Sequence, residues 1–142
     1  MILREINETD VNFIFSSLLK SLRPYKSNVS NDIYYTNEHR RAQHMLLNSL
    51  TMVLVDPADE TRIIGYAVAS VVPEVQVTLH YVYIKKEHRN KGLAHLLITT
   101  VLDNLDSSMP RYCSNFTPLF TNLMKTYNFM YNPYIHDLQL GA

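Results

Sequence analysis

The sequence contains little cysteine, little glycine and no long apolar run. Its single cysteine, Cys113, cannot form an internal disulfide, and a cysteine-rich metal scaffold is excluded for the same reason. No apolar run approaches the ~18 residues that cross a bilayer, and the first residues lack the charged-then-apolar plan of a signal peptide. These absences predict a cytoplasmic protein in a reducing compartment, with no membrane partner.

Glycine occurs only at Gly65, Gly92 and Gly141, whereas average usage of about 7% would supply about ten. Gly141 is nearly terminal, and Gly65 interrupts a run of strand-forming residues, as a glycine at a β-bulge does. A glycine within a motif is therefore unusually informative in this chain, and Gly92 is the one to consider.

The charges give no overall preference for a polyanion. Thirteen Lys and Arg residues balance thirteen Asp and Glu residues, so we expect no nucleic-acid partner. An apolar fraction of 46% and a charged fraction of 18% are typical of a globular protein. With 142 residues the chain has the length of one domain, and we expect a single domain over residues 1–142.

The N-terminal third is predicted to contain a short strand and two helices. Residues 1–6 alternate weakly as a strand does, and Thr9 is a candidate cap for a helix that ends before Pro24. Residues 25–37 show no clear period and are interpreted as a loop that lies against the body. A second helix is expected to follow, with Glu38 facing water.

Three apolar runs separated by turn residues predict an antiparallel meander over residues 52–55, 62–72 and 75–84. A polar loop and an apolar helix follow, and then a strand, a helix and an extended segment. The expected helix face comprises Leu93, Leu96, Leu97, Val101 and Leu105, and the later elements span residues 111–114, 118–127 and 130–140. This order predicts an α/β fold with a mixed, mostly antiparallel central sheet flanked by helices and one right-handed crossover.

A basic loop joins the last meander strand to that helix, and it reads Arg89-Asn90-Lys91-Gly92-Leu93-Ala94. The first turn of a helix has unpaired amides and the positive end of the helix dipole, which favour an anion, phosphate above all. Gly92 permits close backbone approach, and Arg89 and Lys91 add positive charge. The loop therefore predicts a site for a phosphorylated cofactor, with a solvated turn as the alternative. No P-loop or dinucleotide-binding glycine triplet occurs.

This loop matches the Arg/Gln-x-x-Gly-x-Gly/Ala signature of the GNAT superfamily of acyl-CoA-dependent N-acetyltransferases, and the element order resembles that of the family over nearly the whole chain. The resemblance implies that the amides of residues 90–95 wrap the CoA pyrophosphate and that the preceding strand pairs with the pantetheine arm. The cofactor residues implied in this way are Val82, Tyr83, Ile84, Arg89, Asn90, Lys91, Gly92, Leu93, Ala94 and His95. The implied partners are acetyl-CoA and an amine acceptor that the sequence does not identify.

His80 is the candidate general base. It lies on the strand that approaches the thioester in the family, and an ordinary histidine pKa near ~6.5 suits removal of a proton from an amine. Strand alternation places His80 on one face with Val82 and Ile84, and Leu79 and Tyr81 on the other. Many family members have an acidic residue at this place, and the serotonin N-acetyltransferase branch has a histidine. A core histidine whose ring nitrogens are hydrogen-bonded is an equally weighted alternative.

The last helix of the family is written approximately Asn-Pro-x-x-x-x-Leu-Tyr-x-x-x-Gly-Phe, and its Tyr protonates the departing thiolate. Residues 117–129 resemble this pattern, but Met124 stands at the Tyr and cannot donate a proton. Tyr127, one turn further on, is the candidate acid; packing against the sheet is the alternative role for it, and solvent or protonated His80 are alternative donors.

The predicted function is N-acetyltransferase activity, in which an acetyl group passes from acetyl-CoA to a primary amine by direct attack. The alternative is a noncatalytic GNAT-fold module that binds CoA or another protein. An exposed sheet edge would also allow a homodimer, which the sequence does not decide.

Overall fold

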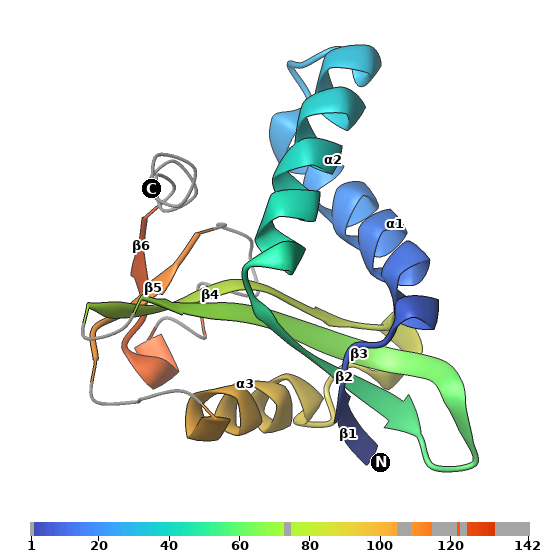
Figure 1. Cartoon of the computed structure of the whole chain (residues 1–142), viewed down its shortest axis with the longest axis vertical. Coiled ribbons are helices and arrows are strands. Elements are labelled where there is room, and N and C mark those ends of the chain that lie inside the picture. The colour runs from blue at the N-terminus through green and yellow to red at the C-terminus, as the bar shows by residue number, and fades with distance from the viewer. Residues whose placement is uncertain (1, 73–74, 105–108, 115–121, 123–124, 133–142) are drawn as a thin grey trace.

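The computed structural model describes residues 2–72, 75–104, 109–114, 122 and 125–132. The strands in this part of the chain form one six-stranded sheet in the order β1-β2-β3-β4-β5-β6 (Figure 1). Neighbours from β1 to β4 are antiparallel, and β5 runs parallel to β4 and β6. The strands are β1 (Ile2–Glu5), β2 (Leu50–Asp56), β3 (Asp59–Val72), β4 (Gln76–Ile84), β5 (Arg111–Cys113) and β6 (Met130–Tyr131). The predicted mixed, mostly antiparallel sheet and its meander are confirmed.

Helices cover both faces of this sheet (Figure 1). The pair α1 (Val11–Leu22) and α2 (Asn31–Leu47) lies on one face, and α3 (Leu93–Asn104) lies on the other. Short 3-10 turns are η1 (Glu8–Asp10), η2 (Arg23–Lys26) and η3 (Lys86–His88). Within the residues that the structure describes, every helix is too short or too polar to cross a membrane.

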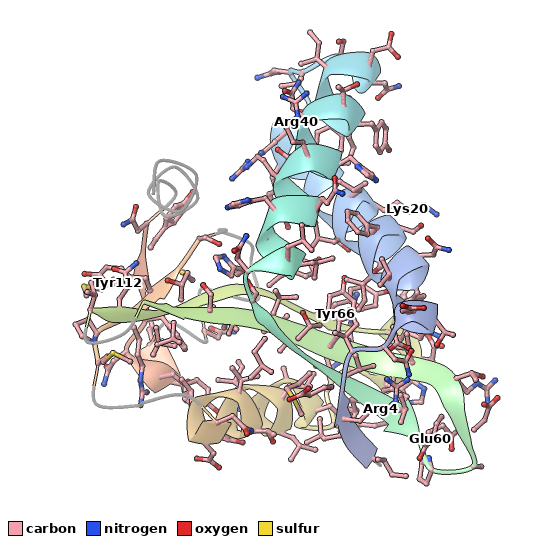
Figure 2. The ribbon with its side chains drawn as sticks, in the orientation of Figure 1. Arg4, Lys20, Arg40, Glu60, Tyr66 and Tyr112 are labelled. Atoms are coloured by element: carbon pink, nitrogen blue, oxygen red, sulfur yellow. The ribbon has the colours of Figure 1, made fainter. Side chains whose placement is uncertain are left out.

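Two apolar clusters fix these layers to the sheet. The cluster on the α3 side includes Leu54, Ile64, Leu79, Leu97, Ile98, Val101 and Cys113. The cluster on the side of α1 and α2 includes Ile14, Leu18, Met45, Val53, Val55, Tyr66 and Val68. Tyr66 projects from β3 towards α1 (Figure 2), and its hydroxyl lies 2.7 Å from Ser17 Oγ. Burial of each large aliphatic side chain contributes about 1.5–3 kcal/mol, so β4 and α3 are held firmly by the core.

The first helix begins after a cap at Asn7 rather than at Thr9. Asn7 Oδ1 accepts a hydrogen bond from Thr9 N at 3.1 Å, and Asp10 Oδ2 accepts one from Asn7 N at 2.9 Å. This reciprocal pair is a capping box on the η1 turn, which precedes α1. The prediction of Thr9 as the cap is wrong, because the chain makes a 3-10 turn before the α-helix.

Asp10 is expected to make folding sensitive to acid. Its buried carboxylate accepts hydrogen bonds from Arg4 Nη1 at 2.6 Å and Arg4 Nη2 at 3.0 Å. Burial alone raises the pKa of Asp10, but the bonds from Arg4 and the Asn7 amide outweigh it and lower the pKa. The resulting stability is present above the ordinary aspartate pKa near ~3.9 and is lost as the pH falls through the lower native value.

Asp10→Asn is therefore expected to flatten the acid limb of a plot of urea midpoint against pH. Asp103→Asn, which changes an exposed residue of α3, serves as the control and leaves the limb unchanged. Identical acid limbs for the wild type and Asp10→Asn would contradict the assignment.

The prediction of a loop over residues 25–37 is wrong from Asn31 onwards, where α2 begins. The helix buries one narrow stripe, formed by Tyr34, Glu38, Ala42 and Met45. Glu38 is 7% exposed instead of facing water; its carboxylate pairs with Lys26 and lies 3.1 Å from Arg41 Nη1. An acidic residue inside the buried stripe conceals the helical period, because the period is recognised by its apolar positions.

A β-bulge in β4 changes which side chains share a face. The register of β3 against β4 shifts at His80, which is skipped between the pairs made by Leu79 and Tyr81. One extra residue reverses the alternation beyond it. Leu79 therefore lies on the α3 side together with Val82 and Ile84, while Tyr81 lies on the opposite side. The predicted face is therefore wrong for Leu79, whereas Val82 and Ile84 share a face opposite Tyr81 as predicted.

The face of α3 that meets the sheet agrees with the prediction at Leu97 and Val101, which are buried, and at Leu93, which packs against the core, but not at Leu96. Leu96 is 41% exposed, and the buried positions are Leu97, Ile98, Val101 and Leu102. Further along, the strands expected near residues 111 and 130 are present as β5 and β6, and residues 125–127 are helical as predicted. The remaining predictions lie outside the described residues; they concern Leu105, residues 73–74, residues 118–121 and 123–124 of the predicted helix, and residues 133–140.

Candidate functional site

Beyond Leu79, β4 continues without a partner strand on its β5 side in the part of the chain that the structure describes. The last bond between this strand and the β5 segment runs from Ser114 N to Leu79 O at 3.2 Å. At the far end, Lys85 N donates to Ile64 O at 2.8 Å and so faces β3. Because successive residues alternate, the backbone groups of Ile84 and Val82 face the open side. These are the residues that the family resemblance assigns to the pantetheine arm.

The turn after β4 places the start of a helix beside this open edge. Asn90 and Gly92 have positive φ angles of 64° and 74°, and α3 begins at Leu93. The left-handed backbone is what requires glycine at Gly92, since a Cβ there would meet no atom within 4 Å. The first helical bond runs from Leu96 N to Gly92 O at 3.2 Å, so the amides before Leu96 have no helical acceptor. The turn therefore supplies unpaired donors next to β4.

A cleft of about 790 Å³ joins these two features. Its wall is formed by Ser21, Tyr25, Tyr81, Val82, Tyr83, Ile84, His88, Arg89, Asn90, Gly92, Leu93, Ala94, His95 and Asn122. Every residue predicted to contact the cofactor lies in this wall except Lys91, which is exposed. Five further residues of the wall were not among those predicted to contact the cofactor: Ser21, Tyr25, Tyr81, His88 and Asn122. His88 directly precedes the basic loop, and Asn122 falls within the segment that resembles the last helix of the family.

The cleft is basic where the turn meets α3. Arg89 Nε donates to Ile84 O at 2.8 Å, which holds the guanidinium against the end of β4 and occupies that carbonyl. His88 and His95 are further basic residues of the wall, and none of the described residues that form it is Asp or Glu. This arrangement favours an anion at the turn.

Tyrosines form the wall of the cleft on the α1 side. Tyr81 is 5% exposed, and burial raises its pKa to about 12, although a hydrogen bond to Ser21 acts in the opposite direction. The ring of Tyr83 stacks on Tyr66 with their centroids 5.4 Å apart. Tyr25 lies at the rim and is half exposed. This wall is therefore aromatic and closely packed, and its Tyr81 hydroxyl stays protonated near neutral pH.

His80 lies in the core beside the cleft rather than in its wall. Its side chain is 0% exposed. The ring joins three segments: Nε2 lies 2.8 Å from Ser70 Oγ on β3, and Nδ1 lies 2.8 Å from Ser114 Oγ after β5. The ring thus ties the β-bulge to the point where β4 and β5 part.

Tyr127 is connected to the cleft by a hydrogen bond to a histidine of its wall. Its hydroxyl lies 2.7 Å from Nδ1 of His95, which is part of the cleft wall. The Tyr127 carbonyl accepts a hydrogen bond from Arg111 Nη1 at 2.9 Å, which connects this residue to β5. The structure therefore brings together two residues, His95 and Tyr127, that the sequence assigned to separate roles.

Comparison with known proteins identifies a family and a fold. Residues 15–112 match the family model described as the acetyltransferase (GNAT) family. The chain is similar to a predicted acetyltransferase from Clostridium acetobutylicum solved with acetyl-CoA, with 14% identity, a TM-score of 0.64, and coverage of 91% of this chain and 89% of that one. It is also similar to a tetramutant of the BH1408 protein from Bacillus halodurans, with 16% identity, a TM-score of 0.61 and 90% coverage of both chains.

A third similar structure is the aminoglycoside N-acetyltransferase AAC(6')-Iy in complex with a bisubstrate analogue of CoA and acetylneamine. The identity is 15%, the TM-score is 0.54, and the match covers 90% of this chain and 89% of that one. A search of curated proteins finds no match. At these identities the solved structures show the fold alone, whereas the family model spans well over half of the sequence. The chain therefore belongs to the acetyltransferase (GNAT) family.

Proposed function

We propose that this protein transfers an acetyl group from acetyl-CoA to a primary amine. The observation that carries the proposal is a cleft in which the open edge of β4 meets the positive-φ turn and the start of α3. A strand edge and a helix N-terminus are complementary to two adjoining parts of CoA, since the pantetheine arm contains amides and the diphosphate is an anion. The similar structures solved with acetyl-CoA and with a CoA bisubstrate analogue support the same substrate.

The backbone of β4 and the side chain of Arg89 are proposed to bind different parts of acetyl-CoA. The backbone groups of Val82 and Ile84 face the open side of β4, where they could pair with pantetheine amides. Because the Ile84 carbonyl already accepts from Arg89, a pantetheine amide would compete with the guanidinium at that carbonyl. A guanidinium released in this way would be free to bind phosphate oxygens in a bidentate manner. Binding of the pantetheine arm and of the diphosphate would then be coupled through Arg89.

The chemistry follows from direct attack. The neutral amine attacks the thioester carbonyl carbon, the carbon–sulfur bond breaks with its electron pair on sulfur, and the amine proton is lost as the thiolate gains one. His80 is the proposed base. Because the ring is buried and its nitrogens are hydrogen-bonded to Ser70 and Ser114, the amine proton would have to reach the ring through a serine hydroxyl. Tyr127 is the proposed acid, with its hydroxyl on His95.

The acceptor is proposed to be an amine that carries little additional positive charge. The described residues of the cleft wall include no carboxylate that would bind a polycation, and the wall on the α1 side is made of tyrosines. Tyrosine faces attract a single ammonium group and pack against apolar surface.

Calorimetric titration of acetyl-CoA into the protein tests binding of the donor substrate. Release of free thiol in the presence of a panel of amines tests transfer of the acetyl group. We expect saturable binding, and thiol release that depends on both the protein and a monoamine. Absence of acetyl-CoA binding would overturn the proposed function.

A noncatalytic module that binds CoA is the second candidate. It is favoured by Met124, which cannot donate a proton, and by the complete burial of His80. Tight binding of acetyl-CoA without thiol release for any amine of the panel would support this candidate over the transferase.

A further inference from the structure

His95 and Tyr127 connect α3 to the segment that precedes β6. Tyr127 Oη lies 2.7 Å from His95 Nδ1, and the two rings are 5.6 Å apart and tilted by 44°. Tyr127 is itself anchored, because its carbonyl accepts from Arg111 and its ring packs at 6.4 Å from Phe129, a buried core residue. The imidazole of His95 is therefore oriented by a fixed neighbour.

This contact determines which ring nitrogen of His95 can donate a hydrogen bond to a ligand. Burial raises the pKa of Tyr127, so its phenol stays protonated near neutral pH. The hydroxyl can therefore donate a hydrogen bond to His95 Nδ1. A neutral imidazole whose Nδ1 accepts a hydrogen bond carries its own proton on Nε2. Since His95 lies in the cleft wall, Nε2–H is the donor that it can offer to a ligand there.

The position of His95 indicates what that ligand group is. His95 is the third residue of α3, so it lies in the same turn as the unpaired amides and close in sequence to Arg89 and Gly92. The described wall contains His88, Arg89 and His95 and no carboxylate, so this end of the cleft is suited to an anion.

We infer that Tyr127 holds His95 in its Nε2–H tautomer and that His95 Nε2 donates a hydrogen bond to a diphosphate oxygen of the acyl-CoA. Tyr127 acts through His95 and is a positioning residue in this role. The inference rests on the proposed function, because it requires acyl-CoA in the cleft. It gives the His95 side chain a part in phosphate recognition, in addition to the contribution of its backbone amide, and it gives Tyr127 a role that does not depend on protonation of the thiolate.

Two substitutions of His95 distinguish the contributions of its two ring nitrogens to binding. In His95→Gln the amide nitrogen is placed about where Nε2 was, whereas in His95→Asn it is placed about where Nδ1 was. We expect His95→Asn to weaken acetyl-CoA binding about tenfold to a hundredfold, as for loss of a hydrogen bond to a charged group, and His95→Gln to restore most of the affinity. We expect Tyr127→Phe, which keeps the ring but not the hydroxyl, to weaken binding about threefold to tenfold, because the tautomer is no longer fixed.

The same titrations with S-acetylpantetheine, which lacks the diphosphate, identify the group that His95 contacts. We expect the His95→Asn and Tyr127→Phe proteins to bind S-acetylpantetheine as the wild type does. A nitrogen NMR spectrum of the imidazole gives a readout that a purely structural role would not change. It should show protonated Nε2 in the wild-type protein and a mixture of tautomers in Tyr127→Phe.

His39→Gln and Tyr112→Phe are the matched controls, since both residues lie outside the described wall of the cleft. Each should leave binding and the His95 spectrum unchanged. Equal losses for acetyl-CoA and S-acetylpantetheine, or unchanged affinity in His95→Asn, would overturn the inference while the proposed function stands. Failure of the wild-type protein to bind acetyl-CoA would instead overturn the proposed function, and this inference with it.

Discussion

Combining Gly92→Val with Arg89→Ala is expected to weaken acetyl-CoA binding by about a hundredfold or more. The φ of 74° at Gly92 is unfavourable for any residue with a Cβ, and a β-branched side chain should force the turn into another conformation at a cost of about 1–3 kcal/mol. Loss of Arg89 removes a cation that can make charge-assisted hydrogen bonds, worth about 1.5–3 kcal/mol. Their sum corresponds to the stated change in affinity.

Calorimetric titration of acetyl-CoA measures this effect, and a thermal melt establishes that the double variant is folded. Lys86→Ala is the control, because Lys86 is an exposed cation of the neighbouring η3 turn and does not line the cleft. It should bind acetyl-CoA nearly as the wild type does. If the folded double variant kept its affinity, the turn between β4 and α3 would not be the anion site.

His80→Ala is expected to lower the free energy of unfolding by about 2–4 kcal/mol. The substitution removes a fully buried ring and leaves the Ser70 and Ser114 hydroxyls without the hydrogen bonds that they make to it. A lost buried partner and a new cavity both destabilise a protein core. Equilibrium unfolding in urea measures the change, and a loss well below 1 kcal/mol would contradict the packing described for the ring.

His80→Gln distinguishes a structural role of His80 from a catalytic one. Glutamine can hydrogen-bond to the serines but cannot take up a proton near neutral pH, so it is expected to recover part of the stability lost in His80→Ala. If His80 is the base, turnover of the folded His80→Gln protein should stay low while its affinity for acetyl-CoA is unchanged. Wild-type turnover in this variant would assign His80 to the structure of the β-bulge alone.

Local patterns in the sequence predicted those parts of the fold that depend on neighbours in the chain. The meander followed from apolar runs broken by turn residues, and it is present as β2, β3 and β4. The residues around Gly92 predicted a helix start after a basic loop, because unpaired amides and a positive φ are properties of a short segment. The assignments of Val82 and Ile84 came from the family resemblance, and both residues lie in the cleft wall.

Predictions of which side chains are buried failed where a single extra residue or a partner distant in the sequence decides the position of the side chain. Periodicity placed Leu79 on the face opposite Val82, and a single extra residue in β4 brings both to the α3 side, since a bulge depends on the pairing with β3. Glu38 reads as a solvent-facing residue of a helix, yet it is buried, because Lys26 and Arg41 compensate its charge. Neither the pairing of β4 with β3 nor the contact of Glu38 with Lys26 can be recognised from the segment in which the residue occurs.

The sequence by itself therefore determined the sheet, the helix that follows β4 and the turn between them, because these depend on the order of apolar residues and on the backbone freedom of Gly92. Only the tertiary structure decided how the side chains of the site are connected. His80 lies between two serines from other segments, and Tyr127 meets His95 across 32 positions of the sequence. The physical reason is that hydrogen bonds between distant segments depend on how helices and strands pack, and packing has no period that a linear pattern can display.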